Sequence, residues 1–347
     1  MLLVLALAAA LWGLGALMKA PRRQRLVLIG LLLGVVILGH LVLPDGHGLR
    51  EATGGSVAPW LILLGLGSLT GVYAYGVRRL RRRAVGTAAP SQSTGLFTET
   101  ELERYARHVV LREIGGPGQA KLKRAKVLVI GAGGLGAPAL QYLAAAGVGT
   151  IGVIDDDIVE NANLQRQVIH RDADIGMPKV FSAEAAMTAQ NPHITVRPYH
   201  RRLKADIAEA LFADYDVILD GTDNFETRYL ANRAAVALGK PLISGALSQW
   251  EGQLSVFHPA RGAPCYQCIF PEAPAPGLAP SCAEAGVLGP LPGILGAMMA
   301  AEAIKVVTGA GTPLLGAMAI HDALYGESRR ISLKRRADCP ICGTATA

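Results

Sequence analysis

The first ninety residues alternate between long apolar runs and short clusters of basic residues. Residues 2–17, 26–43 and 57–77 contain no Asp, Glu, Lys or Arg. A charge at the centre of a bilayer costs about 2.5–3.5 kcal/mol on insertion scales, so charge-free runs near the ~20-residue length of a span predict transmembrane helices. The first run is the shortest. The pattern predicts a membrane anchor over residues 1–85 with about three transmembrane helices.

The hydrophobic pattern changes after a segment rich in Gly, Ser and Pro, residues 86–96, which predicts a flexible linker. Short apolar runs at Lys126–Ile130, 150–154 and 217–219 predict buried strands, and helical patterns separate them. This alternation is typical of a doubly wound, Rossmann-like α/β fold. Alternation through Phe257 adds an antiparallel strand, so we expect a mixed sheet in a domain over residues 97–347.

Charge is distributed unevenly between these two parts. Residues 1–90 carry ten Lys or Arg against Asp45 and Glu51, whereas the remainder carries 24 basic and 25 acidic residues. The basic isoelectric point therefore belongs to the loops that flank the apolar runs, and we expect no nucleic-acid partner. Basic residues crowd the first loop and follow the third run, while the second loop holds only Arg50. The positive-inside rule then places the second domain in the cytoplasm, beneath the inner membrane.

A glycine-rich turn follows the first predicted strand of this domain. Residues 131–136 read Gly-Ala-Gly-Gly-Leu-Gly, and a helix follows through Ala146. Glycines let the backbone approach phosphate, and the helix N-terminus offers free N–H groups. Asp155 ends the next strand, nineteen residues past Gly136, where a ribose-binding carboxylate is expected. Alone, this fingerprint predicts an adenine nucleotide, with nicotinamide or flavin as the usual ligand.

The next seventy residues favour a triphosphate over a redox cofactor. Arg166 and Lys179 suit the larger negative charge of a triphosphate, and Asn163 can donate hydrogen bonds to it. The third strand runs into Asp-Gly-Thr-Asp-Asn, residues 220–224. A carboxylate at this edge of a sheet, beside bound phosphates, is a natural Mg²⁺ ligand.

Four of the five cysteines form two Cys-x-x-Cys pairs. Cys265 and Cys268 make the first pair, and Cys339 and Cys342 make the second. Two such pairs predict a closed tetrahedral Zn²⁺ site that pins the C-terminus onto the domain; buried small residues or a redox dithiol are the alternatives. Four thiolates leave no position open for water, so we expect this zinc to be structural.

Taken together, these motifs resemble the MoeB/ThiF/HesA family of ubiquitin-activating-type adenylyltransferases. The matching features are Arg104 to Arg107, the glycine loop, Asp155 with Asp157, residues 163–167, Lys179, residues 222–224, both cysteine pairs and the segment from Cys282. They occur in family order over the whole second domain. The apolar N-terminal part is a departure, because the familiar members are soluble.

The resemblance implies a reaction in which the C-terminal Gly-Gly carboxylate of a ubiquitin-like sulfur carrier attacks the α-phosphate of ATP. It also implies roles for individual residues. Arg107 reaches into the neighbouring subunit of an obligate homodimer, and Asp223 holds Mg²⁺. The implied nucleotide-binding set is Gly131, Gly133, Gly134, Gly136, Asp155, Asp157, Asn163, Arg166, Gln167, Lys179, Asp223 and Asn224. Molybdopterin-synthase and thiamine-pathway carriers are both compatible with it.

Cys282 is the fifth cysteine, and two interpretations of it remain open. It follows a Pro-rich stretch, which favours an exposed nucleophile for acyl or persulfide chemistry, but no Arg or His lies next to it to activate the thiol. Because no rhodanese-like segment follows Gly343, we expect a separate sulfur donor of the rhodanese or cysteine desulfurase type.

Two other functions are compatible with part of the pattern. A tRNA threonylcarbamoyladenosine dehydratase would share the adenylation chemistry, although its tRNA substrate calls for a basic surface that the second domain lacks. A catalytically idle membrane scaffold would recruit a carrier without reacting, but every expected phosphate and Mg²⁺ position is filled. We therefore expect an active adenylyltransferase.

Overall fold

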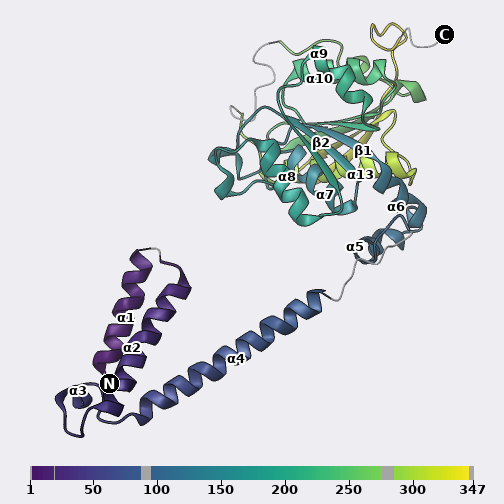
Figure 1. Ribbon diagram of the computed structural model, residues 1–347. Helices are drawn as coiled ribbons and strands as arrows, with labels where there is room; N and C mark the ends of the chain where they lie inside the picture. The colour runs from purple at the N-terminus through teal and green to yellow at the C-terminus, as the bar shows by residue number, and fades with distance from the viewer. Residues whose placement is uncertain (1, 19, 87–94, 276–284, 344–347) are drawn as a thin grey trace. The chain divides into compact units, whose positions relative to one another are not determined.

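The chain forms two compact units, Met1–Gln92 and Ser93–Ala347. The computed structural model describes residues 2–18, 20–86, 95–275 and 285–343 (Figure 1). The regular elements described in the first unit are all helices. The second is an α/β domain.

The first unit contains the helices α1 (Leu2–Leu17), α2 (Arg22–Val42), α3 (Gly48–Ala52) and α4 (Ala58–Gly86). Trp60 is buried with Val4 and Val36 in a small cluster, and its indole Nε1–H donates to the carbonyl of Thr53 at 3.0 Å. Most of the other large apolar side chains of these helices are exposed. Exposed apolar surfaces of this extent mark sites of contact with a membrane or with another protein.

Three helices of the described residues are long and apolar enough to cross a membrane, by length and composition alone. Their apolar windows are Gln24–Val42, Ala58–Val77 and Pro290–Thr308. Half of the third window is buried, and it belongs to the second unit, so its apolar side chains fill a protein core. The helix α1 is apolar but shorter.

The second unit is built on one sheet of eight strands. In chain order the strands are β1 (Lys126–Ile130), β2 (Thr150–Asp155), β3 (Thr195–His200), β4 (Val217–Asp220), β5 (Leu242–Leu247), β6 (Glu251–Phe257), β7 (Ala317–Asp322) and β8 (Glu327–Ser332). In space the order is β3-β2-β1-β4-β5-β6-β7-β8. The first five in this order pair in parallel and the last three pair antiparallel. The sequence prediction of a doubly wound mixed sheet is confirmed.

Helices cover both faces of the parallel part (Figure 1). The helices of this unit are α5 (Glu99–Val109), α6 (Gly115–Arg124), α7 (Gly136–Ala146), α8 (Lys179–Gln190), α9 (Ala205–Ala213), α10 (Phe225–Ala237), α11 (Tyr266–Ile269) and α13 (Pro290–Thr308). Side chains of α7, α8 and α13 pack on one face of the sheet, and those of α9 and α10 pack on the other. Alternate residues of β1 point to opposite faces: Val127 and Val129 pack with α7 and α13, whereas Leu128 and Ile130 pack with α9 and α10. Burial on both faces explains why β1 reads as a continuous apolar run.

The topology creates a crevice at the carboxyl ends of the central strands. The chain leaves β1 toward β2 on one side, and β4 joins β1 on the other side. Ligands of doubly wound sheets bind where the strand order reverses in this way. The second unit therefore places its ligand-binding position beside the end of β1.

Candidate functional site

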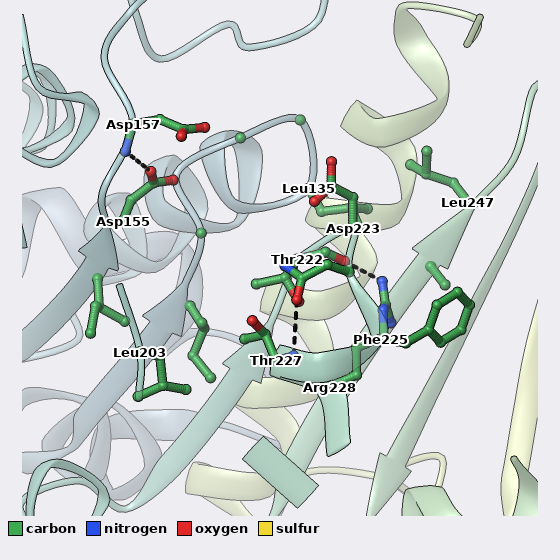
Figure 2. A pocket seen from close by; sticks show the side chains of 18 of the residues that line it. Leu135, Asp155, Asp157, Leu203, Thr222, Asp223, Phe225, Thr227, Arg228 and Leu247 are labelled. Carbon is green, nitrogen blue, oxygen red and sulfur yellow. Dashed lines mark hydrogen bonds between the residues drawn. The ribbon is translucent and has the colours of Figure 1, made fainter. Parts of the chain in front are cut away.

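A cavity of about 780 Å³ occupies this crevice. It is lined at the ends of the strands by Ile130, Asp155, Gly221 and Leu247. Figure 2 shows Asp155 and Asp157 at one end of this space and Asp223 toward the other. The volume lies within the range of small-molecule sites, about 300–1,000 Å³.

The glycine loop after β1 forms one wall. Gly131 has φ of 91°, a conformation that favours glycine. A Cβ on Gly136 would lie 1.8 Å from the carbonyl oxygen of Gly131, so only glycine fits at the start of α7. Gly133 and Gly134 line the cavity beside Gly131, whereas Gly136 supports the turn from outside the lining. The loop therefore exposes backbone at the N-terminus of α7.

Asp155 holds this loop through its carboxylate. Its Oδ2 accepts from the backbone N–H of Ala132 at 2.7 Å, and its Oδ1 accepts from that of Asp157 at 2.8 Å. Burial raises the pKa of Asp155, and the two N–H groups oppose that effect. Each carboxylate oxygen keeps a lone pair free for a ligand hydroxyl.

The cationic side of the cavity carries Arg166 and Lys179. The ammonium group of Lys179 is buried and lies 2.7 Å from the carboxylate of Asp157, which is exposed. Arg166 donates to Oδ1 of Asn163 at 3.1 Å, and Asn163 itself does not line the cavity. Gln167 lines the cavity and is 4% exposed, and its Oε1 is buried with no hydrogen-bond partner among the described residues. This side thus offers two cations and an open acceptor.

The loop after β4 carries the two candidate residues Asp223 and Asn224. Asp223 is exposed at the cavity, and no ion pair or hydrogen bond engages its carboxylate within the described part of the chain. Asn224 is the N-cap of α10, where its Oδ1 accepts from the N–H of Thr227 at 2.9 Å. Asp223 is therefore available to a ligand, and Asn224 has a structural task as well.

A buried network beneath this loop was not identified from the sequence. Asp220 is fully buried and accepts from the Thr222 hydroxyl at 2.7 Å and from the Ser244 hydroxyl at 3.0 Å. The guanidinium of Arg228 lies 3.8 Å from Asp220 and donates to the carbonyl of Thr222. The sequence did contain one indication of this network. Arg228 follows Asn224 by one helical turn, and this spacing places the Arg228 side chain beneath the loop.

The four predicted zinc ligands meet at one point. All four sulfurs lie within 4.8 Å of one another, and each of these four cysteines is buried. The Sγ···Sγ separations are 3.9 Å for Cys265 and Cys268, 3.6 Å for Cys265 and Cys339, and 3.4 Å for Cys268 and Cys342. A tetrahedral zinc with Zn–S bonds of about 2.3 Å requires separations of about 3.8 Å. The residues present fit a closed zinc site.

Besides Gly136 and Asn163, two further predicted residues, Arg107 and Cys282, are not part of the described cavity lining. Arg107 is exposed on α5 and does not line the cavity. The helix α5 is fixed to the end of α8, where Asn191 donates to the Tyr105 hydroxyl at 2.8 Å and Arg104 donates to the Gln190 carbonyl at 2.6 Å. Cys282 lies outside the described residues.

A model of the ThiF family matches residues 105–341, more than half of the chain, and the protein therefore belongs to the ThiF family. A sulfur carrier protein adenylyltransferase of Thermus thermophilus is 49% identical over 251 residues, covering 71% of this chain and 93% of the relative. The SAMP-activating enzyme E1 of Haloferax volcanii is 46% identical over 244 residues, covering 70% and 90%. The mouse adenylyltransferase and sulfurtransferase MOCS3 is 46% identical, and 55% of its length is covered.

Solved structures share the fold at lower identity. The crystal structure of E. coli MccB with ATP superposes with a TM-score of 0.59 at 23% identity, over 66% of this chain and 69% of that one. The crystal structure of PaaA gives a TM-score of 0.61 at 22% identity, over 86% and 90%. Both likenesses concern the fold alone.

Proposed function

We propose that this protein uses ATP to adenylate the C-terminal Gly-Gly carboxylate of a ubiquitin-like sulfur carrier. A relative at 49% identity that is named a sulfur carrier protein adenylyltransferase supports the proposal. The observation that carries it is one cavity in which a glycine loop, two cations and the unengaged carboxylate of Asp223 face each other. A hydride-transfer enzyme needs only the first of these features.

In this proposal the nucleotide lies along the glycine loop. Its phosphates approach the backbone at Gly131, Gly133 and Gly134, and its ribose hydroxyls bind the free lone pairs of Asp155. Gln167 accepts from the nucleotide through the oxygen that has no protein partner. Matching a buried open acceptor with a ligand donor removes the cost of leaving it unpaired, about 1–3 kcal/mol.

Arg166 and Lys179 would neutralise the triphosphate, with Asn163 orienting Arg166. Lys179 must then exchange the exposed carboxylate of Asp157 for phosphate oxygens. Asp223 would hold Mg²⁺, with Asn224 beside it, since a carboxylate and phosphate oxygens are the ligands that Mg²⁺ prefers. The Mg²⁺ ion would offset the negative charge of those phosphate oxygens that Arg166 and Lys179 do not contact.

The chemical step forms one bond and breaks one. A carboxylate oxygen of the carrier attacks the α-phosphorus, the bond between that phosphorus and the bridging oxygen to the β-phosphate breaks, and pyrophosphate leaves. The carboxylate is already ionised at neutral pH. The protein residues therefore act by positioning and charge neutralisation, and no general base is required.

The remaining parts of the proposal concern assembly. Zinc held by Cys265, Cys268, Cys339 and Cys342 would fix the C-terminal segment to the domain. Arg107 would complete the site of a second copy in a homodimer, since it lies outside the cavity of its own chain. Cys282 would take part only after adenylation, in acyl or persulfide chemistry with a separate sulfur donor of the rhodanese or cysteine desulfurase type.

We also propose that residues 1–85 anchor the enzyme in the inner membrane, with residues 86–96 as linker and the domain of residues 97–347 in the cytoplasm. The exposed apolar surfaces of α2 and α4 support the anchor, because lipid would cover them. The basic clusters at Lys19 to Arg25 and after Val77 support the orientation.

ATP–pyrophosphate exchange by the full chain tests the function. Each candidate Gly-Gly carrier is added in turn, of the molybdopterin-synthase and thiamine-pathway types. We expect exchange that depends on one carrier and on Mg²⁺ and that is lost in Asp223→Ala. Tight ATP binding without exchange, whichever carrier is present, would direct the search to another carboxylate substrate.

A further inference from the structure

A buried histidine lies directly behind the glycine loop. His170 is 6% exposed, and its Nε2 lies 2.9 Å from the carbonyl oxygen of Ala132, the second residue of the loop. On the other side its Nδ1 lies 2.9 Å from Oγ of Ser182, and that hydroxyl lies 2.7 Å from Oδ2 of Asp174. A continuous chain of contacts therefore runs from Asp174 to the loop.

The peptide groups around Ala132 are held on both sides. The N–H of Ala132 donates to Asp155 at 2.7 Å, and its carbonyl faces His170. The loop glycines Gly131 and Gly133 on either side of it line the cavity. The orientation of these loop N–H groups toward a ligand thus depends on Asp155 and His170 together.

The protonation of His170 decides whether this chain of contacts is complete. The Ala132 carbonyl can only accept, so Nε2 must carry a proton. The ionised carboxylate of Asp174 also only accepts, and the Ser182 hydroxyl has one proton to give it. Oγ of Ser182 then accepts from the ring, which requires a proton on Nδ1 too. Only the imidazolium satisfies all three contacts, and the neutral ring leaves one of them without a hydrogen.

Five influences act on the charge of this ring. Burial is the largest and lowers the pKa of His170, and the nearby ammonium of Lys179 on α8 lowers it further. The hydrogen bond to Ala132 and the carboxylates of Asp155 on β2 and Asp174 oppose these effects. A triphosphate against the loop would add negative charge and engage Lys179, and both changes favour the imidazolium.

We propose that His170 is a positioning residue for the glycine loop and that ATP binding draws a proton from solvent onto its Nδ1. This inference rests on the proposed function, because it takes ATP to be the ligand of the loop. The proton completes the contacts from Asp174 through Ser182 to Ala132. The loop N–H groups are then fixed at the moment when phosphate oxygens arrive.

Isothermal titration of the full chain with MgATP, in buffers of different ionisation enthalpy, measures the proton uptake. His170→Gln keeps an N–H for the Ala132 carbonyl but cannot titrate. We expect the wild-type chain to take up a larger fraction of a proton than this variant. His321→Gln is the matched control, because Nδ1 of His321 also lies 2.9 Å from a serine, Ser328, and neither residue lines the cavity.

The pH dependence has a defined sign. Since the complex favours the protonated ring, the ATP affinity of the wild-type chain, relative to His170→Gln, is highest at low pH. It falls as pH rises through the pKa of His170 in the complex, by up to about tenfold per pH unit. Ser182→Ala leaves Nδ1–H without an acceptor, so we expect it to move this fall to lower pH.

Equal proton uptake by the wild-type chain and both His170→Gln and Ser182→Ala, with ATP bound in every case, would overturn this inference alone. Absence of ATP binding by the wild-type chain would overturn the proposed function and this inference with it. If His170→Gln does not fold, the pH dependence of ATP affinity in Ser182→Ala tests the inference instead: an unchanged pH dependence would overturn it.

Discussion

Asp220 and Arg228 form a buried ion pair, with 3.8 Å between Oδ2 and the nearer guanidinium nitrogen, beneath the loop that carries Asp223. Asp220 also accepts from Thr222 and Ser244, and Arg228 donates to the Thr222 carbonyl. The carboxylate of Asp220 is therefore engaged in buried contacts that hold the segment in place. Of the two aspartates in this segment, only Asp223 faces the cavity. Arg228 thus keeps Asp220 in a structural role, and Asp223 remains free to bind a ligand.

Arg228→Met should therefore destabilise the domain. Removing one partner of a buried ion pair costs about 3–5 kcal/mol, because the other charge stays buried. For a domain of this size we expect a fall in Tm of roughly 10 °C by calorimetry. Arg202→Met is the control, since Arg202 also lines the cavity but its ion pair with Glu226 is exposed, at 3.9 Å. Equal Tm values for the two variants would contradict the role of Arg228.

Asp223→Asn should remove activity and leave stability almost unchanged. Its carboxylate is exposed and has no partner in the described residues, so we expect a change in unfolding free energy within about 0.5 kcal/mol. Pyrophosphate exchange should fall at least about a hundredfold, as for a lost electrostatic contact in a transition state. Asp156→Asn changes another exposed aspartate of the same cavity and should keep its exchange. Equal losses in both variants would argue against Asp223 as the Mg²⁺ ligand.

The loop glycines should differ in their tolerance of a methyl group. A Cβ at Gly136 would lie 1.8 Å from the backbone oxygen of Gly131, whereas a Cβ at Gly133 would meet nothing nearer than Gln167, at 3.6 Å. Gly136→Ala must displace the backbone, and we expect it to cost about 3 kcal/mol or more in denaturant unfolding. Gly133→Ala should unfold near the wild-type midpoint. A stable Gly136→Ala would show that the turn can relax.

The sequence predicted the parts of this domain that depend on local pattern. The apolar run of β1, the glycines after it and Asp155 at the end of β2 were all placed correctly, because strand ends and turns follow from neighbouring residues. The paired cysteines were also brought together as expected. Spacing along the chain was sufficient in each case.

The contacts that depend on how helices return to the sheet were not predicted. Lys179 follows Asp157 by 22 positions, and the segment between them includes two short helical turns. Nothing in the order of its residues indicates that the two side chains pair. His170 follows Ala132 by 38 positions, and the order of residues does not indicate that contact either. Periodicity was also insufficient for α4, because the predicted apolar run ends at Val77 whereas the helix continues to Gly86.

The attachment of α5 should depend on pH through Glu101. Burial alone would raise the pKa of Glu101, but hydrogen bonds from Lys123 and from the Thr98 backbone outweigh it and lower the pKa. A lowered pKa contributes stability above the usual pKa of glutamate, and this is lost as pH falls through the lowered value. At pH 7 we expect Glu101→Gln to be about 1–2 kcal/mol less stable than the wild-type chain.

The difference between Glu101→Gln and the wild-type chain should close in acid, which urea unfolding at pH 7 and near pH 3 can measure. Glu103→Gln, at an exposed position of the same helix, provides the control and should show no such closure. A difference that stays constant with pH would mean that the ion pair with Lys123 contributes nothing and that packing alone explains the loss.

Zinc binding should depend on the four paired cysteines and not on the fifth cysteine, Cys282. We expect one zinc per wild-type chain by elemental analysis, none in Cys268→Ser, and one in Cys282→Ser. Cys268→Ser should also weaken pyrophosphate exchange, because Tyr266 lies between two of the ligands and lines the cavity, packed 5.6 Å from Phe257 between ring centroids. Without zinc, the segment from Cys265 to Cys268 is no longer held by the metal, and we expect Tyr266 and the cavity wall to shift with it. Full exchange by a zinc-free Cys268→Ser would show that aromatic packing around Tyr266 fixes this wall without the metal.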